Sequence, residues 1–405
     1  MRAFPWAVVV SLGLAGSPAL AKSPKDTPTF APLVDLGTLV PEHAVSDGWA
    51  INDAGLVVGS SANVAVAWVP APDRRLTGYT IKALRLDLTG EVAGTFGTSA
   101  RVLGLNNLGQ IVGIVSANLG GAGVILPRAA VWDAHDQAPR SLALLPGARG
   151  SNGRVINDWG QVAGSVGGPS GSFLVTWREG VPEVLPTLGG AGGLVHALNN
   201  VGQMTGTLPR GQGGPAVPVA WLPDGDGYRV VELPNLGDAT GNFDFGRGIN
   251  DAGLIVGCSG LTTGAFDVEG FPIASEVGAF VWDLTDGDVT RFRPGPATWP
   301  AALAPAPDAD AWAALRLNGT ANGINERSEA VGYVGVNGSL DGGDGELYYL
   351  TTAAYWRNGG KAPVLLGTLG GANSFARAIN ERGDIVGLAD TADGETHAFI
   401  TRRQQ

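Results

Sequence analysis

A nine-residue pattern that recurs seven times constrains the fold of this chain more than any other feature. The pattern is apolar, Asn, acidic or Asn, any residue, Gly, any residue, apolar, any residue, Gly. It occupies residues 51–59, 105–113, 156–164, 198–206, 249–257, 324–332 and 379–387, and successive asparagines lie 54, 51, 42, 51, 75 and 55 residues apart. A period of about 50 residues indicates a propeller or a solenoid.

Each copy of the pattern predicts a tight β-hairpin. Asn at the first turn position, followed three residues later by Gly, is typical of a type I turn closed by a glycine with positive φ. A third apolar strand follows, and in six repeats it ends in Trp68, Trp132, Trp177, Trp221, Trp282 or Trp356. A fourth short strand comes next, most clearly at residues 184–188, 230–233 and 364–369. Four strands per repeat make one propeller blade.

The two ends of the repeat array indicate a closed ring. The seventh repeat stops after its third strand, residues 397–401, and has no fourth strand. The missing strand has a counterpart at the other end, because residues 34–39 (VDLGTL) match residues 366–369 (LGTL). Pairing of this N-terminal strand into the last blade would close the ring and remove a long exposed edge. We therefore predict an all-β, seven-bladed propeller of four-stranded blades.

The last repeat resembles the HAF-repeat family of extracellular proteins. His397, Ala398 and Phe399 reproduce the His-Ala-Phe sequence that names the family, and residues 366–387, LGTLGGANSFARAINERGDIVG, are close to its consensus. The resemblance covers essentially the whole chain after the signal peptide, with departures such as Ala279-Phe280, which lacks the histidine, and Ser328, which replaces the turn glycine. It implies an exported repeat protein and supplies no functional residues.

The N-terminal residues are typical of a secretory signal peptide. Arg2 precedes an apolar stretch at residues 4–15, and Ala19-Leu20-Ala21 forms a cleavage signature. We expect a signal peptide at 1–21, a flexible leader at 22–30 and the propeller at 31–405, in a secreted protein of the periplasm or the medium. No later stretch has the roughly 18 to 20 apolar residues of a transmembrane helix. The single cysteine, Cys258, is expected to pack as a small apolar residue.

The charge of the chain excludes two classes of partner. After removal of the expected signal peptide, which contains Arg2, the chain has 25 Lys and Arg against 37 Asp and Glu, a net charge of −12. Nucleic acids and anionic membranes are bound through clustered basic residues. We therefore expect no nucleic-acid or membrane partner, and we expect a monomer that could bind an extracellular glycan or an envelope protein.

The acidic residues at the turns have two interpretations. Asp53, Asp158, Asp251, Glu326 and Glu381 recur at one position of the pattern. They could serve acid-base chemistry or metal binding, but turns favour such residues for structural reasons. The acidic segments 224–227 and 341–346 lack the alternating ligands and distal Glu of a calcium loop, and hairpin turns are the favoured interpretation. We predict no cofactor and no metal.

The sequence contains no recognisable catalytic motif. The four histidines lie in different repeats, and neither an HExxH pair nor a Gly-x-Ser-x-Gly elbow is present. The favoured function is therefore a secreted, non-catalytic binding scaffold. A propeller-type polysaccharide hydrolase or lyase and a structural envelope component remain as alternatives, because dispersed residues can converge in a ring.

One position of the repeat predicts a binding site at the channel mouth. Three residues before each turn asparagine, the chain carries Trp49, Leu103, Arg154, His196, Arg247, Asn322 and Arg377. Ring geometry should bring these residues together, and three arginines and a histidine would suit a carboxylate of an acidic sugar. The alternative is that each arginine pairs with a nearby acid or carbonyl. The turn acids of the same repeat, four residues further and about 13 Å away, cannot be those partners.

Aromatic residues outside the repeat provide a second set of candidates. Six in-register tryptophans are expected to pack between blades. The candidate loop aromatics are Phe243, Phe245, Phe271, Tyr348 and Tyr349, with Trp299 and Trp312 in the same class. We expect the variable loops between second and third strands to lie on the face of the ring that carries the ligand. Residues 293–307 should be irregular, with a short helix at 308–317.

Overall fold

The computed structural model describes residues 28–40, 45–73, 75–91, 95–119, 123–168, 171–234, 245–266, 272–291, 316–339, 347–357 and 362–404. The expected signal peptide and most of the leader lie outside these residues. Within these ranges, no helix is long and apolar enough to cross a membrane.

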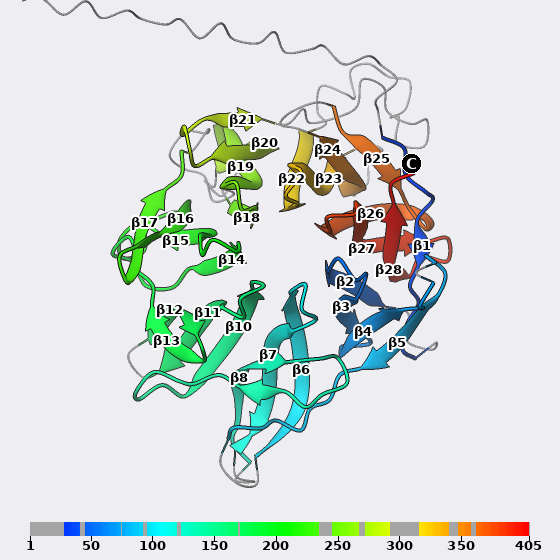
Figure 1. Ribbon diagram of the computed structural model, residues 1–405. Helices are drawn as coiled ribbons and strands as arrows, with labels where there is room; N and C mark the ends of the chain where they lie inside the picture. Colours follow the sequence, from blue (N-terminus) through cyan, green and yellow to red (C-terminus); the bar gives the residue numbers. More distant parts are fainter. Residues whose placement is uncertain are drawn as a thin grey trace, which may run out of the picture.

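Seven four-stranded antiparallel blades surround a common axis, and their first strands face the centre of the ring (Figure 1). From inside to outside, the blades are β2 (Ser46–Ile51), β3 (Val57–Ser61), β4 (Val64–Pro70), β5 (Tyr79–Ala83); β6 (Phe96–Leu105), β7 (Ile111–Asn118), β8 (Ile125–Trp132), β9 (Arg140–Ser141); β10 (Gly150–Ile156), β11 (Val162–Gly168), β12 (Gly171–Arg178), β13 (Val181–Val184); β14 (Leu194–Leu198), β15 (Met204–Pro209), β16 (Ala216–Asp224), β17 (Gly227–Glu232); β18 (Phe245–Ile249), β19 (Leu254–Phe266), β20 (Pro272–Asp283), β21 (Val289–Arg291); β22 (Arg316–Ile324), β23 (Glu329–Ser339), β24 (Leu347–Arg357), β25 (Val364–Gly367); and β26 (Gly370–Ile379), β27 (Asp384–Thr391), β28 (Thr396–Arg402), β1 (Val34–Asp35). The predicted seven-bladed propeller is confirmed.

The N-terminal strand closes the ring, as the repeat ends predicted. In the seventh blade, β1 pairs antiparallel with β28, with Val34 opposite Ile400 (Figure 1). The histidine of the His-Ala-Phe sequence takes part in this closure, because His397 Nδ1 lies 2.7 Å from an Asp35 carboxylate oxygen. The first described strand and the last one are therefore joined by backbone and side-chain contacts.

The turn asparagines form a continuous ring of hydrogen bonds between blades. Asn52 Oδ1 accepts the backbone N–H of Leu56, which fixes its own turn, while its Nδ2 donates to the carbonyl of Asn106 in the next blade at 3.1 Å. The same contact passes through every blade, and Asn380 closes the ring by donating to the carbonyl of Asn52 at 3.0 Å. All seven asparagines are 5% exposed or less. Each one therefore joins a hairpin to its neighbour in a buried environment.

The residues that follow the turn asparagines, five acids together with Asn107 and Asn200, form a second ring of hydrogen bonds. The backbone N–H of Asp53 donates to Asn107 Oδ1, and the pattern continues around the axis until the N–H of Glu381 donates to Asp53 Oδ1 at 2.8 Å. A side-chain oxygen at this position satisfies a backbone donor of the preceding blade. The structure thus gives the turn acids a specific structural role, since they hold adjacent blades together.

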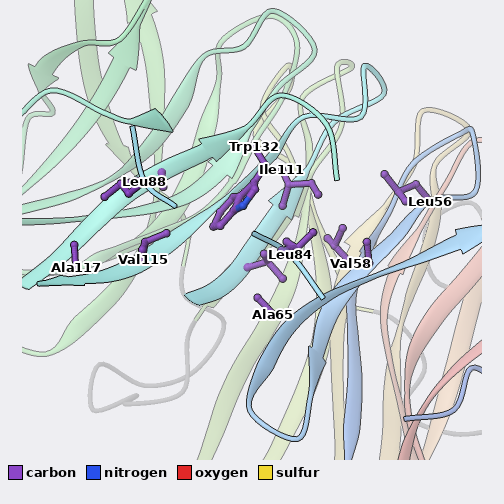
Figure 2. Close-up of a cluster of buried hydrophobic side chains, with 12 residues drawn as sticks. Leu56, Val58, Ala65, Leu84, Leu88, Ile111, Val115, Ala117 and Trp132 are labelled. Carbon is purple, nitrogen blue, oxygen red and sulfur yellow. The ribbon is translucent and has the colours of Figure 1, made fainter. Parts of the chain in front are cut away.

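The recurrent tryptophans fill the contacts between blades. Figure 2 shows Trp132 of the second blade in one buried cluster with Val58 and Ala65 of the first. Its indole N–H donates to the carbonyl of Arg85 at 2.8 Å. All six recurrent tryptophans are at most 1% exposed, and the prediction that they pack between blades is confirmed.

The C-terminal segment ties the sixth and seventh blades together. Arg403, just after β28, contacts the buried carboxylate of Glu329 in the sixth blade, which also accepts a hydrogen bond from the Tyr355 hydroxyl at 2.9 Å. Phe30, just before β1, lies against the Tyr355 ring with a centroid distance of 5.0 Å. Residues from both ends of the ring therefore reach past the last blade onto its neighbour.

Several local expectations differ from the structure. Arg316 and Leu317 open strand β22, so the expected helix at 308–317 is wrong at its end, and residues 308–315 lie outside the described ranges, as do the expected irregular residues 293–307. The long loops of the fifth and sixth repeats are largely extensions of the β19–β20 and β23–β24 hairpins. Asp224 pairs with Gly227 across a hairpin turn, as favoured. Cys258 is buried, and residues 341–346 are outside the described ranges.

We predict that Ser328→Gly will stabilise the protein. Ser328 occupies the turn position that glycine holds in the other six repeats, with φ +57°. A side chain in this region costs about 1 kcal/mol relative to glycine. The free energy of unfolding of Ser328→Gly, measured with urea, should rise by about that amount, whereas Ser328→Ala should show no such gain. An unchanged Ser328→Gly variant would mean that this turn is unstrained.

Candidate functional site

The first strand of every blade contains an irregularity at the same position. In the first blade, Gly48 pairs with Gly59 and Ala50 with Val58, so Trp49 between them has no partner. The equivalent unpaired residues of the other blades are Leu103, Arg154, His196, Arg247, Asn322 and Arg377. These β-bulges redirect one side chain out of the normal alternation of the strand. The seven residues predicted from the sequence are the seven bulge residues.

The second glycine of the repeat makes room for this bulge. A Cβ atom on Gly59 would lie 1.9 Å from the carbonyl oxygen of Asp47 on the bulged strand. The corresponding distances for the other six glycines lie between 1.8 and 2.1 Å. No larger residue fits without moving the backbone of the first strand. The glycine at the end of each nine-residue pattern therefore permits the β-bulge that orients the channel residue.

The bulge residues converge on one pocket in the channel. A cavity of about 130 Å³ is lined by all seven of them, together with Val155. Two residues further along each strand, a ring of Ile and Leu lines a second cavity of about 220 Å³, which extends to the turn asparagines and acids. Because each first strand runs toward its turn, the arginine pocket lies on the side of the aliphatic ring that faces the variable hairpins.

Arg154, His196 and Arg247 come from three consecutive blades and form one wall of this pocket. Arg154 Nη2 lies 3.4 Å from His196 Nδ1. Burial, followed by the charges of Arg154 and Arg247, lowers the pKa of His196 to about 3. Burial and the charges of Arg247 and Arg101 also lower the pKa of Arg154. This wall therefore carries two guanidinium groups and a neutral imidazole.

The opposite side of the channel contains an internal ion pair. Arg377 Nη2 lies 3.2 Å from an Asp47 carboxylate oxygen of the next blade, and its guanidinium carbon is 4.4 Å from the centre of the Trp49 ring. Burial raises the pKa of Asp47, although Arg377 opposes this effect. The alternative interpretation, in which a channel arginine pairs with a nearby acid, therefore holds for Arg377. Arg154 and Arg247 have no acidic partner within 4.0 Å among the described residues.

Phe245 belongs to this pocket region rather than to an insertion. It opens β18, two residues before Arg247, whose guanidinium carbon lies 5.0 Å from the centre of its ring. The ring also meets His196 edge-on, with a centroid distance of 6.2 Å. Its assignment as a loop residue is corrected, because the bulge brings the preceding part of the strand against the same wall.

The remaining candidate aromatics lie in a strand or outside the described residues. Tyr348 and Tyr349 lie in strand β24, opposite Gly338 and Asn337, and not in a loop. Phe243, Phe271, Trp299 and Trp312 lie outside the described residues.

Sequence reasoning missed Asp47 and Arg101 as channel residues, and it named Phe245 only as a loop aromatic. All three lie five residues before a turn asparagine, and each contacts or faces the bulge residues of its own or a neighbouring blade. The sequence signal that could have found them is the position two residues before each bulge residue, compared across the repeats. On the opposite face, Trp159 at the third-blade turn is 81% exposed, with its indole N–H bonded to the carbonyl of Asn200.

Comparisons with known proteins found similarity only among solved structures, at the level of the fold. No family model matches the sequence, and no curated protein matches it. The β-propeller domain of the Trilobed protease from Pyrococcus furiosus is similar over 94% of this chain and 96% of its own, with 10% identity and a TM-score of 0.44. YCF48 bound to D1 peptide is similar over 96% and 100%, with 12% identity and a TM-score of 0.44. The propeller assignment itself rests on the strand pairing.

We predict that Gly164→Ala will both destabilise the protein and disturb the pocket. The new Cβ would lie 1.9 Å from the carbonyl oxygen of Asn152, two residues before Arg154. The free energy of unfolding should fall by about 2 kcal/mol. Gly167→Ala in the same strand is the matched control, because its Cβ would meet no atom within 4 Å, and it should change stability by less than about 0.5 kcal/mol. Equal effects of the two variants would contradict the proposed role of the glycine.

We also predict a specific pH dependence of stability from His196. Unfolded histidine binds a proton near pH 6.5, whereas folded His196 does so only near pH 3. The unfolded state therefore binds more protons in this interval, and acid favours unfolding. Urea unfolding of the wild type between pH 6.5 and about 3 should show a steeper loss of stability than His196→Gln. Parallel curves would mean that His196 is not held neutral.

Proposed function

We propose that this chain is an exported, non-catalytic binding protein of the HAF-repeat type, whose channel binds anionic groups of an extracellular or periplasmic ligand. Carboxylates of an acidic polysaccharide are the chemistry that fits the pocket best. An acidic segment of an envelope protein would engage the same groups. The observation that carries the proposal is the pair of half-buried arginines, Arg154 and Arg247, that lack an acidic partner among the described residues.

The charge of the molecule supports this interpretation. Arg101, Arg154, Arg247 and Arg377 gather around one channel in a chain with a net charge of −11. Burying like charges together is unfavourable unless an anion or another partner compensates them. Among the described residues, Arg377 has such a partner in Asp47, whose charge also acts on Arg101. A ligand carboxylate would compensate the remaining positive charge.

The physical setting favours strong recognition of anions. Hydrogen bonds between guanidinium and carboxylate groups are charge-assisted and can be bidentate. They are also strengthened where the surroundings exclude water. The rigid ring positions the arginines before binding, so little conformational entropy is lost when the ligand enters.

We predict that the double variant Arg154→Ala, Arg247→Ala will lose binding to oligogalacturonate. Loss of one charge-assisted hydrogen bond should lower the affinity about tenfold, so loss of both should raise the dissociation constant measured by calorimetry about a hundredfold. Wild-type binding should also weaken with added salt. The control variant Arg75→Ala, Arg85→Ala removes the same charge from exposed pairs with Asp73 and Asp87, and it should stay within about twofold of the wild type.

Other outcomes point to different functions. Equal binding by the double variant and the wild type would remove the channel as the ligand site. Release of shortened products would support the hydrolase or lyase alternative, and no binding to any acidic glycan or envelope fraction would support a structural role. Export is tested separately, by sequencing the N-terminus of secreted protein, which should begin near Lys22.

A further inference from the structure

We propose that the wall formed by Arg154, His196 and Arg247 is a donor-only receptor that selects oxyanions carrying no proton of their own. Carboxylates and sulfate esters belong to this class, whereas a phosphate monoester belongs to it only after losing its second proton. This proposal rests on the anion-binding function of the channel and specifies the ligand chemistry of the same pocket.

The side chains of this wall fix the direction of its hydrogen bonds. Guanidinium groups can donate hydrogen bonds and cannot accept them. Arg154 Nη2 lies 3.4 Å from His196 Nδ1, so Nδ1 must act as the acceptor. A neutral imidazole with its lone pair on Nδ1 carries its proton on Nε2. His196 Nε2 is therefore a donor, and it is buried without a protein partner among the described atoms.

Arg247 adds a further donor to the same wall. Its Nε is also buried without a hydrogen-bond partner in the described structure, and its guanidinium packs on Phe245. The neighbours of His196 are Arg154, Arg247 and Phe245, and none of these side chains has an acceptor atom. The wall thus carries N–H groups from three consecutive blades, and its one side-chain acceptor, His196 Nδ1, is occupied by Arg154.

The acceptors of the channel lie on other blades. Asp47, in the first blade, pairs with Arg377 through Oδ2, and its Oδ1 is buried without a partner among the described atoms. Asn322 uses its Nδ2 to donate to the carbonyl of Ala376 at 2.8 Å, which leaves its Oδ1 as an acceptor in the sixth blade, next to the wall. A ligand bound on the arginine wall therefore meets donors there. A P–OH group facing this wall would lose its hydrogen bond to water without gaining another, at a loss of affinity of at least about tenfold.

The test compares glucuronate, glucose 6-sulfate and glucose 6-phosphate as probes in calorimetry over a pH series. Phosphate monoesters lose their second proton near pH 6, whereas His196 stays neutral in this range. Asp47, whose pKa burial raises, faces the channel from the first blade, and the other two probes control for any effect of its titration. Binding of glucose 6-phosphate should tighten at least about tenfold as the pH rises through about 6. Binding of the other two probes should remain constant over the same range.

Two variants separate this proposal from a simple charge effect, because the second charge of the phosphate would also strengthen binding. His196→Asn places a carboxamide oxygen, an acceptor, on the wall, and it should bind the phosphate monoanion more tightly and so reduce the pH dependence several-fold. Leu108→Asn adds the same group at an exposed turn position of the second blade, outside the pocket, and should behave as the wild type. His196→Gln repeats the test if the first variant does not fold.

The outcomes distinguish the two proposals. An identical pH dependence in the wild type, His196→Asn and Leu108→Asn would overturn the donor-only receptor while leaving anion binding intact. No binding of any probe by the wild type would overturn anion binding in the channel itself.

Discussion

The ring of asparagine side chains is the interaction on which the rest of the structure depends. Each carboxamide accepts a backbone N–H within its own hairpin and donates to the carbonyl of the next turn, so it fixes a local turn and the neighbouring blade together. Because the chain of contacts returns from Asn380 to Asn52, the ring of turns has no free end. Buried amide groups cost free energy unless both their donors and acceptors are paired, and this geometry pairs them.

The two glycines of the repeat serve different purposes, and the second one links the scaffold to the pocket. The first has a positive φ, which the turn requires. The second removes a Cβ that would collide with the first strand, as at Gly164 and Asn152. That strand can then bulge and direct Arg154 into the channel. A requirement of backbone packing, repeated seven times, thus creates seven variable positions around one axis.

The channel combines layers of different chemistry. Acidic and amide side chains surround the turn face, Ile and Leu form the next ring, and Arg154, His196, Arg247 and Arg377 line the pocket beyond it. The turn acids are held by backbone N–H groups and hold the blades in return. The arginine layer has less internal compensation, with Asp47 as the partner of Arg377. This difference separates a structural charge ring from a candidate ligand site.

The sequence alone was sufficient for the blade number, the closing strand and the ring of channel residues, because a repeat places equivalent residues at equivalent positions around an axis. Val34 and Trp49 could be assigned from register alone. Register could not reveal the contacts between blades: the pairing of Arg377 with Asp47, the orientation of Phe245 toward His196, or the hydrogen bonds of the turn acids. Nor did it predict the β19–β20 and β23–β24 hairpin extensions. Those features depend on distances between residues far apart in the chain, which only the closed ring determines.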